Sequence, residues 1–145
     1  MTREQPPRAY IAGPLFTPGD RWYLEHVDRR CAELGYATYL PHRDAGLSPP
    51  SGEGTRYYFD ADIDALNDAD VIVAVLNGPD VESGTAWELG YAHALGTPIV
   101  AIVDDTRVAD PAVNINLMIY HSADVCTSID DLIDKLKQHL PRSHR

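Results

Sequence analysis

Cysteine is scarce in this sequence, and long apolar runs are absent. The two cysteines, Cys31 and Cys126, lie far apart and in no metal-ligand spacing, which favours a reduced cytosolic state over a disulfide framework. No apolar run is long enough to span a membrane, and residues 1–8 lack the apolar stretch of a signal peptide. We therefore expect a cytoplasmic protein with no membrane partner.

Basic residues are also few, with 12 Lys and Arg against 22 Asp and Glu and a formal net charge of -10 at pH 7. This excess of acidic charge repels an extended phosphate backbone, so we expect no nucleic-acid partner. A single nucleoside or nucleotide is still compatible, because one pocket can be complementary whatever the overall charge. The length of 145 residues and the 44% hydrophobic content suit one globular domain over residues 1–145, with residues 1–7 flexible.

Several familiar functional motifs are missing. The first expected strand is followed by Gly13-Pro14-Leu15-Phe16 and not by a Walker-type loop or a G-x-G-x-x-G motif, which disfavours nucleoside-triphosphate and dinucleotide enzymes. The six histidines have no metal-like pairing, and the acidic residues between Asp60 and Asp70 fit no metal-binding loop. We expect no metal, and no Ser-His-Asp set can be assigned.

What the sequence does contain is a regular alternation of short apolar runs with helical patterns. We expect strands at residues 8–12, 36–40, 71–76, 98–103 and 123–126, and helices at residues 20–34, 57–68, 84–95, 114–120 and 128–140. The run at 71–76 is apolar and largely β-branched, as in the central strand of a parallel sheet. Right-handed crossovers then give an α/β fold with a doubly wound, mostly parallel sheet in a flavodoxin-like or Rossmann-like three-layer sandwich.

Details within this pattern carry further expectations. Residues 41–56 are polar and rich in Pro and Gly, which predicts a mobile loop. Asp20 is the expected N-cap of the first helix, whose apolar stripe places Trp22 and Cys31 in the core. Ser128 is the expected cap of the last helix.

In open parallel sheets, ligands bind beyond the carboxyl ends of the strands, so the loops after Ala12 and Leu76 are the first candidates for a site. The second loop leads to a helix start where Glu88 has two interpretations. Thr85 and Glu88 have the spacing of a capping box, with Ser83 as a competing N-cap. Alternatively, an ionised Glu88 favoured by the helix dipole is a nucleophile for attack on an anomeric carbon.

Four motifs occur in a fixed order along the chain: YIAGPLF at 10–16, DID at 62–64 ahead of ADV at 69–71, SGTAWELGYA at 83–92, and NLM at 116–118. Together they resemble the nucleoside 2-deoxyribosyltransferase family. The resemblance covers residues 8–120, and the third motif is its most specific part.

The resemblance implies a flavodoxin-like fold, no metal or organic cofactor, and a ping-pong exchange in nucleotide salvage, with nucleosides and free bases as small-molecule partners. Deoxyribose is held covalently on a Glu, which Glu88 matches. Tyr10 matches a tyrosine that orients the nucleophile, and Asp62 matches the acid that protonates the departing base. Asn116 matches a residue lent by a neighbouring subunit, which implies a homo-oligomer with shared active sites.

One position departs from the family pattern, because Glu82 stands where an Asp usually lies six residues before the nucleophile. Glu82 from a shifted backbone, or Asp80, is expected to bind the sugar. Trp87 is expected to be a core anchor. Asn116 has a second interpretation, as the cap of a short helix. The residues we assign to substrate binding are Gly13, Phe16, Asp80, Glu82, Ser83, Gly84, Asn116 and Met118.

Two alternatives remain open. A hydrolase on the same scaffold, which would be similar to nucleoside 5'-monophosphate N-glycosidases, uses water as the acceptor. The first loop here lacks the Ser- and Arg-bearing, Gly-rich sequence suited to phosphate, which favours unphosphorylated nucleosides. The second alternative is a non-catalytic nucleotide-sensing or receiver-like module, since fold alone does not fix function. The Glu-bearing helix start does not supply the acidic cluster of a receiver.

Overall fold

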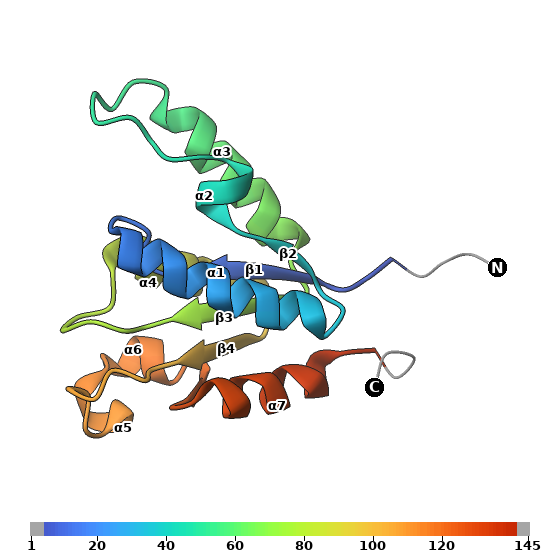
Figure 1. Cartoon of the computed structure of the whole chain (residues 1–145), viewed down its shortest axis with the longest axis vertical. Coiled ribbons are helices and arrows are strands. Elements are labelled where there is room, and N and C mark those ends of the chain that lie inside the picture. Colours follow the sequence, from blue (N-terminus) through green and yellow to red (C-terminus); the bar gives the residue numbers. More distant parts are fainter. Residues whose placement is uncertain (1–4, 142–145) are drawn as a thin grey trace.

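The structure is a computed structural model that describes residues 5–141, and its centre is a five-stranded parallel sheet (Figure 1). The strand order is β2-β1-β3-β4-β5. The strands are β1 (Arg8–Ala12), β2 (Ala37–Tyr39), β3 (Val71–Val75), β4 (Ile99–Ile102) and β5 (Asp124–Cys126). This is the doubly wound order of flavodoxin-like folds, so the expected fold class and the central position of the 71–76 run are confirmed.

Helices cover both faces of the sheet. One face carries α1 (Pro18–Glu33) and α7 (Ile129–His139), and the other carries α3 (Thr55–Asp68) and α4 (Ser83–Leu95). Three short helices lie in the connections: α2 (Pro41–Asp44), α5 (Pro111–Asn114) and α6 (Leu117–Tyr120). The result is the expected three-layer sandwich with an apolar core on each side of the sheet.

The alternation of side chains along the strands decides which residues reach the face covered by α3 and α4. In β1, Ala9 and Ile11 join the core under α1 and α7, whereas Tyr10 and Ala12 join the opposite core. Successive residues of a strand point to opposite faces. Tyr10 is therefore directed toward α3 and α4.

Helix capping agrees with one expectation and corrects another. Ser128 caps α7, because its hydroxyl accepts a hydrogen bond of 3.2 Å from the backbone N–H of Asp131. The expected cap of the first helix was wrong, because Thr17 occupies that position and α1 begins at Pro18. Thr17 and Asp20 form a reciprocal capping box, in which Asp20 is the third helical residue.

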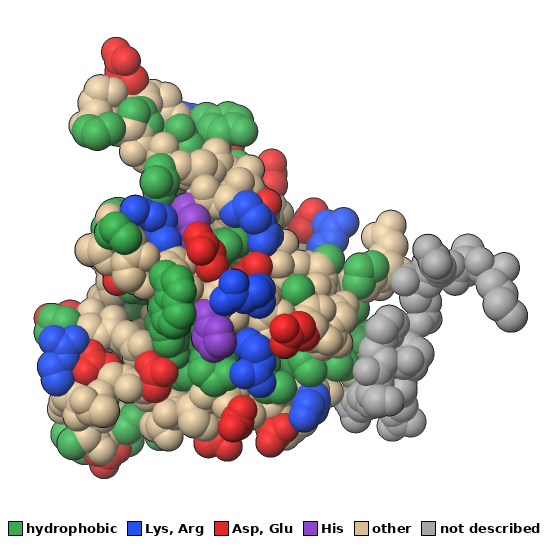
Figure 2. Space-filling model, viewed as in Figure 1, with side chains coloured by type: hydrophobic (Ala, Val, Ile, Leu, Met, Phe, Trp, Pro, Cys, Tyr) green, Lys and Arg blue, Asp and Glu red, His purple; other side chains and the backbone are tan. Residues whose placement is uncertain are grey.

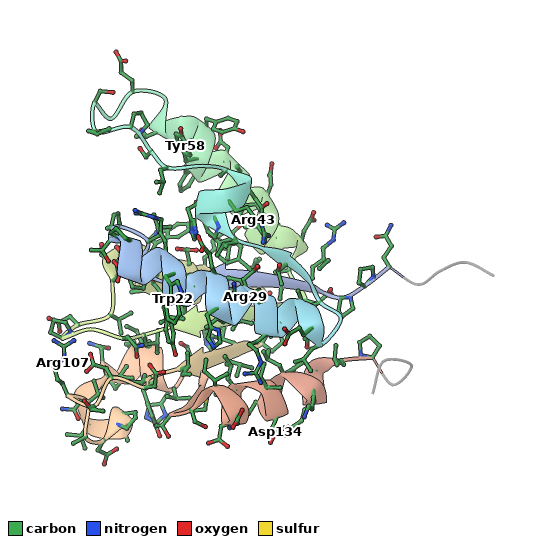
Figure 3. The ribbon with its side chains drawn as sticks, in the orientation of Figure 1. Trp22, Arg29, Arg43, Tyr58, Arg107 and Asp134 are labelled. Atoms are coloured by element: carbon green, nitrogen blue, oxygen red, sulfur yellow. The ribbon has the colours of Figure 1, made fainter. Side chains whose placement is uncertain are left out.

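The segment 41–56 is not a loop throughout, because α2 occupies its start and α3 already begins at Thr55. Arg43 fastens α2 to α1 through Asp28, with a nitrogen-to-oxygen distance of 2.9 Å (Figure 3). The intervening loop and the first half of α3 project beyond the sheet (Figure 1). Apolar side chains are exposed on this projection, including Leu47, Tyr57 and Phe59.

The expected core position of Trp22 was wrong, whereas that of Cys31 is confirmed. Trp22 is 62% exposed on the outer side of α1 (Figure 3), where it stacks on His26. Cys31 and Cys126 are both buried and unbridged, and burial raises the pKa of Cys31 to about 12. Around Trp22, acidic and basic side chains are interspersed over α1 and α2 (Figure 2).

Two expectations concern parts of the chain beyond this framework. Residues 1–7 were expected to be flexible, and residues 1–4 of this segment lie outside the described residues. Within 5–141, no helix has the length and apolar character needed to cross a membrane.

Candidate active site

A cavity of about 420 Å³ lies between α3 and the first turns of α4, within the size range of small-molecule sites. It is lined by Phe59, Asp62, Ile63, Leu66, Ser83, Gly84, Trp87 and Glu88. Because α4 follows the central strand β3, the cavity opens at the carboxyl end of the sheet. The sheet edge expected to bind ligand therefore does carry a cavity.

Glu88 supplies a buried carboxyl group to this cavity from the second turn of α4. Its Oε2 atom is shielded from solvent and has no hydrogen-bond partner among the described residues. Burial raises the pKa of Glu88 to about 8, and the negative charges of Asp62 and Glu82 act in the same direction. The Tyr10 hydroxyl opposes this rise. A buried carboxyl whose pKa is perturbed and whose Oε2 atom has no hydrogen-bond partner is typical of a functional group.

Tyr10 of β1 is the residue of the sheet that faces Glu88. It is fully buried, and its hydroxyl makes no hydrogen bond of ordinary geometry within the described chain. Burial, followed by the charges of Glu88 and Asp62, raises the pKa of Tyr10 far above its usual value. Tyr10 therefore keeps its proton and faces the carboxyl groups as a donor.

Asp62 lies across the cavity on α3. The hydroxyl of Tyr39 donates a hydrogen bond of 2.9 Å to Asp62 Oδ1. Burial raises the pKa of Asp62, and the Tyr39 hydrogen bond opposes part of that rise. The Tyr39 ring stacks on Tyr10, with centroids 5.3 Å apart and planes 21° from parallel. Tyr39 was not among the residues predicted from the sequence, because no motif marks it.

Glu82 caps α4, which corrects both capping interpretations of this helix. Its carboxylate accepts hydrogen bonds from the backbone N–H of Gly84 at 2.9 Å and of Thr85 at 2.8 Å, and these contacts lower the pKa of Glu82. The Thr85 hydroxyl donates to Glu82 as well. Ser83 is therefore not the cap, and Glu88 takes no part in a capping box.

Two glycines that were assigned to substrate binding lie in close contact with neighbouring side chains. A Cβ at Gly13 would lie 2.6 Å from Leu24 Cδ2 and 3.1 Å from Val75 Cβ, so the first loop can approach α1 only with glycine there. A Cβ at Gly84 would lie 3.1 Å from Glu82 Oε2. Gly84 also lines the Glu88 cavity, whereas Gly13 packs against α1.

The family model for nucleoside 2-deoxyribosyltransferase matches residues 9–123. The chain belongs to the nucleoside 2-deoxyribosyltransferase family. It is therefore an enzyme of a family that acts on nucleosides and bases as small-molecule substrates.

One relative has a hydrolase activity attributed to it, and two solved structures share the fold of this chain. A protein of Thermofilum pendens with an attributed 2'-deoxynucleoside 5'-phosphate N-hydrolase activity is 29% identical over 94% of this chain and 96% of its own. A conserved protein from Enterococcus faecalis superposes with a TM-score of 0.80 at 28% identity, covering 92% of this chain and 99% of the other. The 2-deoxyribosyltransferase from Leishmania mexicana superposes with a TM-score of 0.72 at 25% identity and the same coverage.

The remaining residues assigned from the family resemblance lie outside the Glu88 cavity in this chain. Asp80 and Asn116 line a separate cavity of about 130 Å³ between the loop after β3 and the α5–α6 segment. Phe16 is 69% exposed and Met118 is 73% exposed. Asn116 Oδ1 accepts a hydrogen bond of 2.9 Å from the backbone N–H of Met118, so the second interpretation of Asn116, as a helix cap, is confirmed.

Trp87 was expected in the core, and that expectation was wrong. It is 51% exposed and forms one wall of the cavity. Its ring stacks on Tyr91, with centroids 5.4 Å apart, and meets the edge of Phe59 from α3 at 5.9 Å. The spacing of Trp87 and Tyr91, four residues apart on a helix, was a signal for this pair, whereas the contact with Phe59 spans two helices.

Within residues 5–141, no group of three or more His, Cys, Asp and Glu side chains is arranged to hold a metal ion.

Proposed function

We propose that this chain is a nucleoside 2-deoxyribosyltransferase that exchanges the base of 2'-deoxynucleosides through a covalent deoxyribosyl–Glu88 intermediate. The observation that carries the proposal is the Glu88 carboxyl, buried and without a partner at Oε2, in one cavity with Asp62. Burying a carboxyl oxygen without a hydrogen-bond partner lowers the stability of the fold. A role as the nucleophile toward a sugar explains why the carboxyl is kept there.

In the first half-reaction, a Glu88 oxygen attacks C1' of the deoxynucleoside. A C1'–O bond forms as the C1'–N bond breaks, and the electron pair of the broken bond passes to the base, which takes a proton from Asp62. Glu88 must be ionised and Asp62 protonated for this step. Burial raises both pKa values, and the reactive form is the one that carries its proton on Asp62 and leaves Glu88 ionised.

In the second half-reaction, a nitrogen of the incoming base attacks C1' and the electron pair of the C1'–O bond returns to Glu88. Asp62 takes up the proton that the incoming base loses. Two inversions at C1' give retention of the β configuration. Tyr10 assists by directing its hydroxyl toward Glu88, where it favours the ionised carboxylate.

A hydrolase is the second candidate, and the activity attributed to the Thermofilum pendens relative favours it. In a hydrolase, water attacks C1' and the C1'–N bond breaks. The products are the free base and the free sugar, or the sugar 5-phosphate where the substrate carries a 5'-phosphate. The first loop argues against a 5'-phosphate in either reaction. Nη1 of Arg21 donates hydrogen bonds to the carbonyls of Leu15 and Phe16, at 2.9 and 3.1 Å, which holds this guanidinium against the loop. The first turn of α1 carries the acidic Asp20, which repels phosphate.

We also propose that the active form is a homo-oligomer with shared sites. Asn116 stands on an exposed apolar projection formed with Val113, Leu117 and Met118, which is a surface suited to contact with a second copy. The Glu88 cavity has an exposed aromatic rim at Phe59 and Trp87. Such a contact brings Asn116 of one copy toward the sugar end of the other copy's cavity.

Incubation with a 2'-deoxynucleoside and a different free base tests the proposal. Chromatography should show a new β-nucleoside, and intact-protein mass spectrometry should show a deoxyribosyl adduct on the wild type that is absent from Glu88→Ala. Release of only free base and free sugar at every acceptor concentration would replace transfer with hydrolysis. No turnover of deoxynucleosides, together with release of base from their 5'-monophosphates, would replace the proposal with a 5'-phosphate N-hydrolase.

A further inference from the structure

Tyr39 connects the two groups assigned to the chemistry, although no sequence motif points to it. It is the last residue of β2, and the parallel register places it beside Tyr10 of β1. Its ring stacks on Tyr10 and its hydroxyl donates to Asp62 Oδ1 at 2.9 Å. One side chain therefore contacts both the partner of the nucleophile and the acid.

The direction of this hydrogen bond restricts the proton on Asp62. Oδ1 accepts from the Tyr39 hydroxyl, so the acidic proton of a neutral Asp62 belongs on Oδ2, the oxygen that is free to meet a base. Burial and the charge of Asp62 raise the pKa of Tyr39, which keeps the hydroxyl as a donor at neutral pH.

We propose that Tyr39 is a positioning residue that fixes the reactive oxygen of Asp62 and strengthens Asp62 as an acid. The inference rests on the proposed function, because it concerns how Asp62 protonates the departing base. When the proton moves from Oδ2 to the base nitrogen, negative charge develops on Asp62. The hydrogen bond from Tyr39 is stronger to a charged carboxylate than to a neutral one, so it stabilises the transition state more than the ground state.

Tyr39 also packs against other residues, and the test must leave this packing unchanged. Its ring packs against the core under α3 and α4 and borders a groove between β2 and α3. Asp44 of α2 and Tyr57 of α3 act on the pKa of Tyr39, and the charge of Asp62 acts on the pKa values of Tyr10 and Glu88. Replacement of Tyr39 by Phe removes the hydroxyl alone and keeps the ring.

The test compares Tyr39→Phe with wild type over a range of pH, using deoxynucleosides with a good and a poor leaving base. We expect turnover of the poor leaving base to fall about tenfold, as for loss of a hydrogen bond to a charged group, with a smaller loss for the good one and little change in KM. Loss of the donor raises the pKa of Asp62, so the decline of turnover at high pH should move upward by about one unit. In an Asp62→Asn background, Tyr39→Phe should add little.

Tyr36→Phe is the matched control, because the Tyr36 hydroxyl donates to the Leu136 carbonyl on the opposite face of the sheet. It should keep the wild-type rate and pH profile. Equal slowing for both leaving bases with an unmoved pH profile in Tyr39→Phe would overturn the inference and leave Tyr39 as a packing residue.

A second measurement separates this inference from the proposed function. The ¹³C chemical shift of the Asp62 carboxyl reports its pKa without turnover, and Tyr39→Phe should raise that pKa by about one unit. An unchanged pKa refutes the role of Tyr39 even if the wild type forms the sugar adduct. A wild type that forms no adduct refutes the proposed function, whether or not the pKa moves.

Discussion

Replacement of Glu88 by Gln should abolish turnover and stabilise the protein at the same time. Gln has nearly the same shape, so it fits the position of Glu88 in the second turn of α4. The neutral amide cannot act as the nucleophile, and we expect a loss of at least about 10³-fold in turnover. An amide is also much less costly than a carboxylate to bury without a partner.

The stability gain follows from the pKa of Glu88, which rises from an ordinary value of 4.5 to about 8 on folding. Between these two values the folded state holds a proton that the unfolded state has released. Stability therefore falls as pH rises through this window, and the loss is complete only above the folded pKa. At pH 7 the cost is about 3 kcal/mol, most of which Glu88→Gln removes.

Thermal unfolding at several pH values measures this effect. For a domain of this size, the gain corresponds to a rise in Tm of about 5–10 °C at pH 7, shrinking to nothing below pH 4.5. Glu53→Gln is the control, because Glu53 is exposed in the loop before α3 and should leave Tm unchanged. Equal pH dependence of Tm in wild type and Glu88→Gln would refute the burial argument, and full activity in Glu88→Gln would refute the nucleophile.

Three further predictions address the neighbouring groups. Asp62→Asn should keep substrate binding, because the amide oxygen can still accept a hydrogen bond from the Tyr39 hydroxyl. It should slow release of the base, and most strongly for poor leaving bases. Equal slowing for all bases in rapid-quench assays would contradict the role of Asp62 as an acid. Glu82→Ala should lower the free energy of unfolding in urea by about 1 kcal/mol through loss of the α4 cap, whereas Asp80→Ala, an exposed control, should change it little. Co-refolded mixtures of Asn116→Ala and Glu88→Ala should regain activity; no recovery despite subunit exchange would place Asn116 outside a shared site.

The framework of the fold was predictable because its signals are local. Residues 71–76 are apolar and largely β-branched, a pattern typical of a short strand buried on both faces. The cap of α7 was equally local, since Ser128 and Asp131 are three residues apart. Alternation of strands and helices then limited the topology to a doubly wound sheet, although the exposure of Trp22 was not visible in its helical spacing.

The cap of α4 could not be predicted from spacing. Glu82, Ser83 and Thr85 all lie at the helix start, and the choice among them depends on where the backbone leaves its extended conformation. Glu82 has φ −57° and ψ 138°, so its side chain reaches the first free N–H groups and Thr85 becomes a donor to it. The contact between Tyr39 and Asp62 could not be predicted from the local sequence, because it depends on the pairing of Tyr39 with Tyr10 in neighbouring strands.

The position of Glu82 also strengthens the functional interpretation of Glu88. If Glu88 had taken part in a capping box, hydrogen bonds to the start of the helix would have stabilised its carboxylate. The carboxylate would then have needed no functional explanation. Glu82 occupies that role with both of its oxygens, and its charge makes ionisation of Glu88 harder. A carboxyl that is buried, has one oxygen without a hydrogen-bond partner and is destabilised by its neighbour violates the local rules of folding at one point, and natural proteins tolerate such violations mainly where chemistry requires them. Since the same cavity holds Asp62, whose pKa is also raised, the arrangement suits a reaction in which one carboxyl group attacks a carbon atom and the other exchanges a proton with a base.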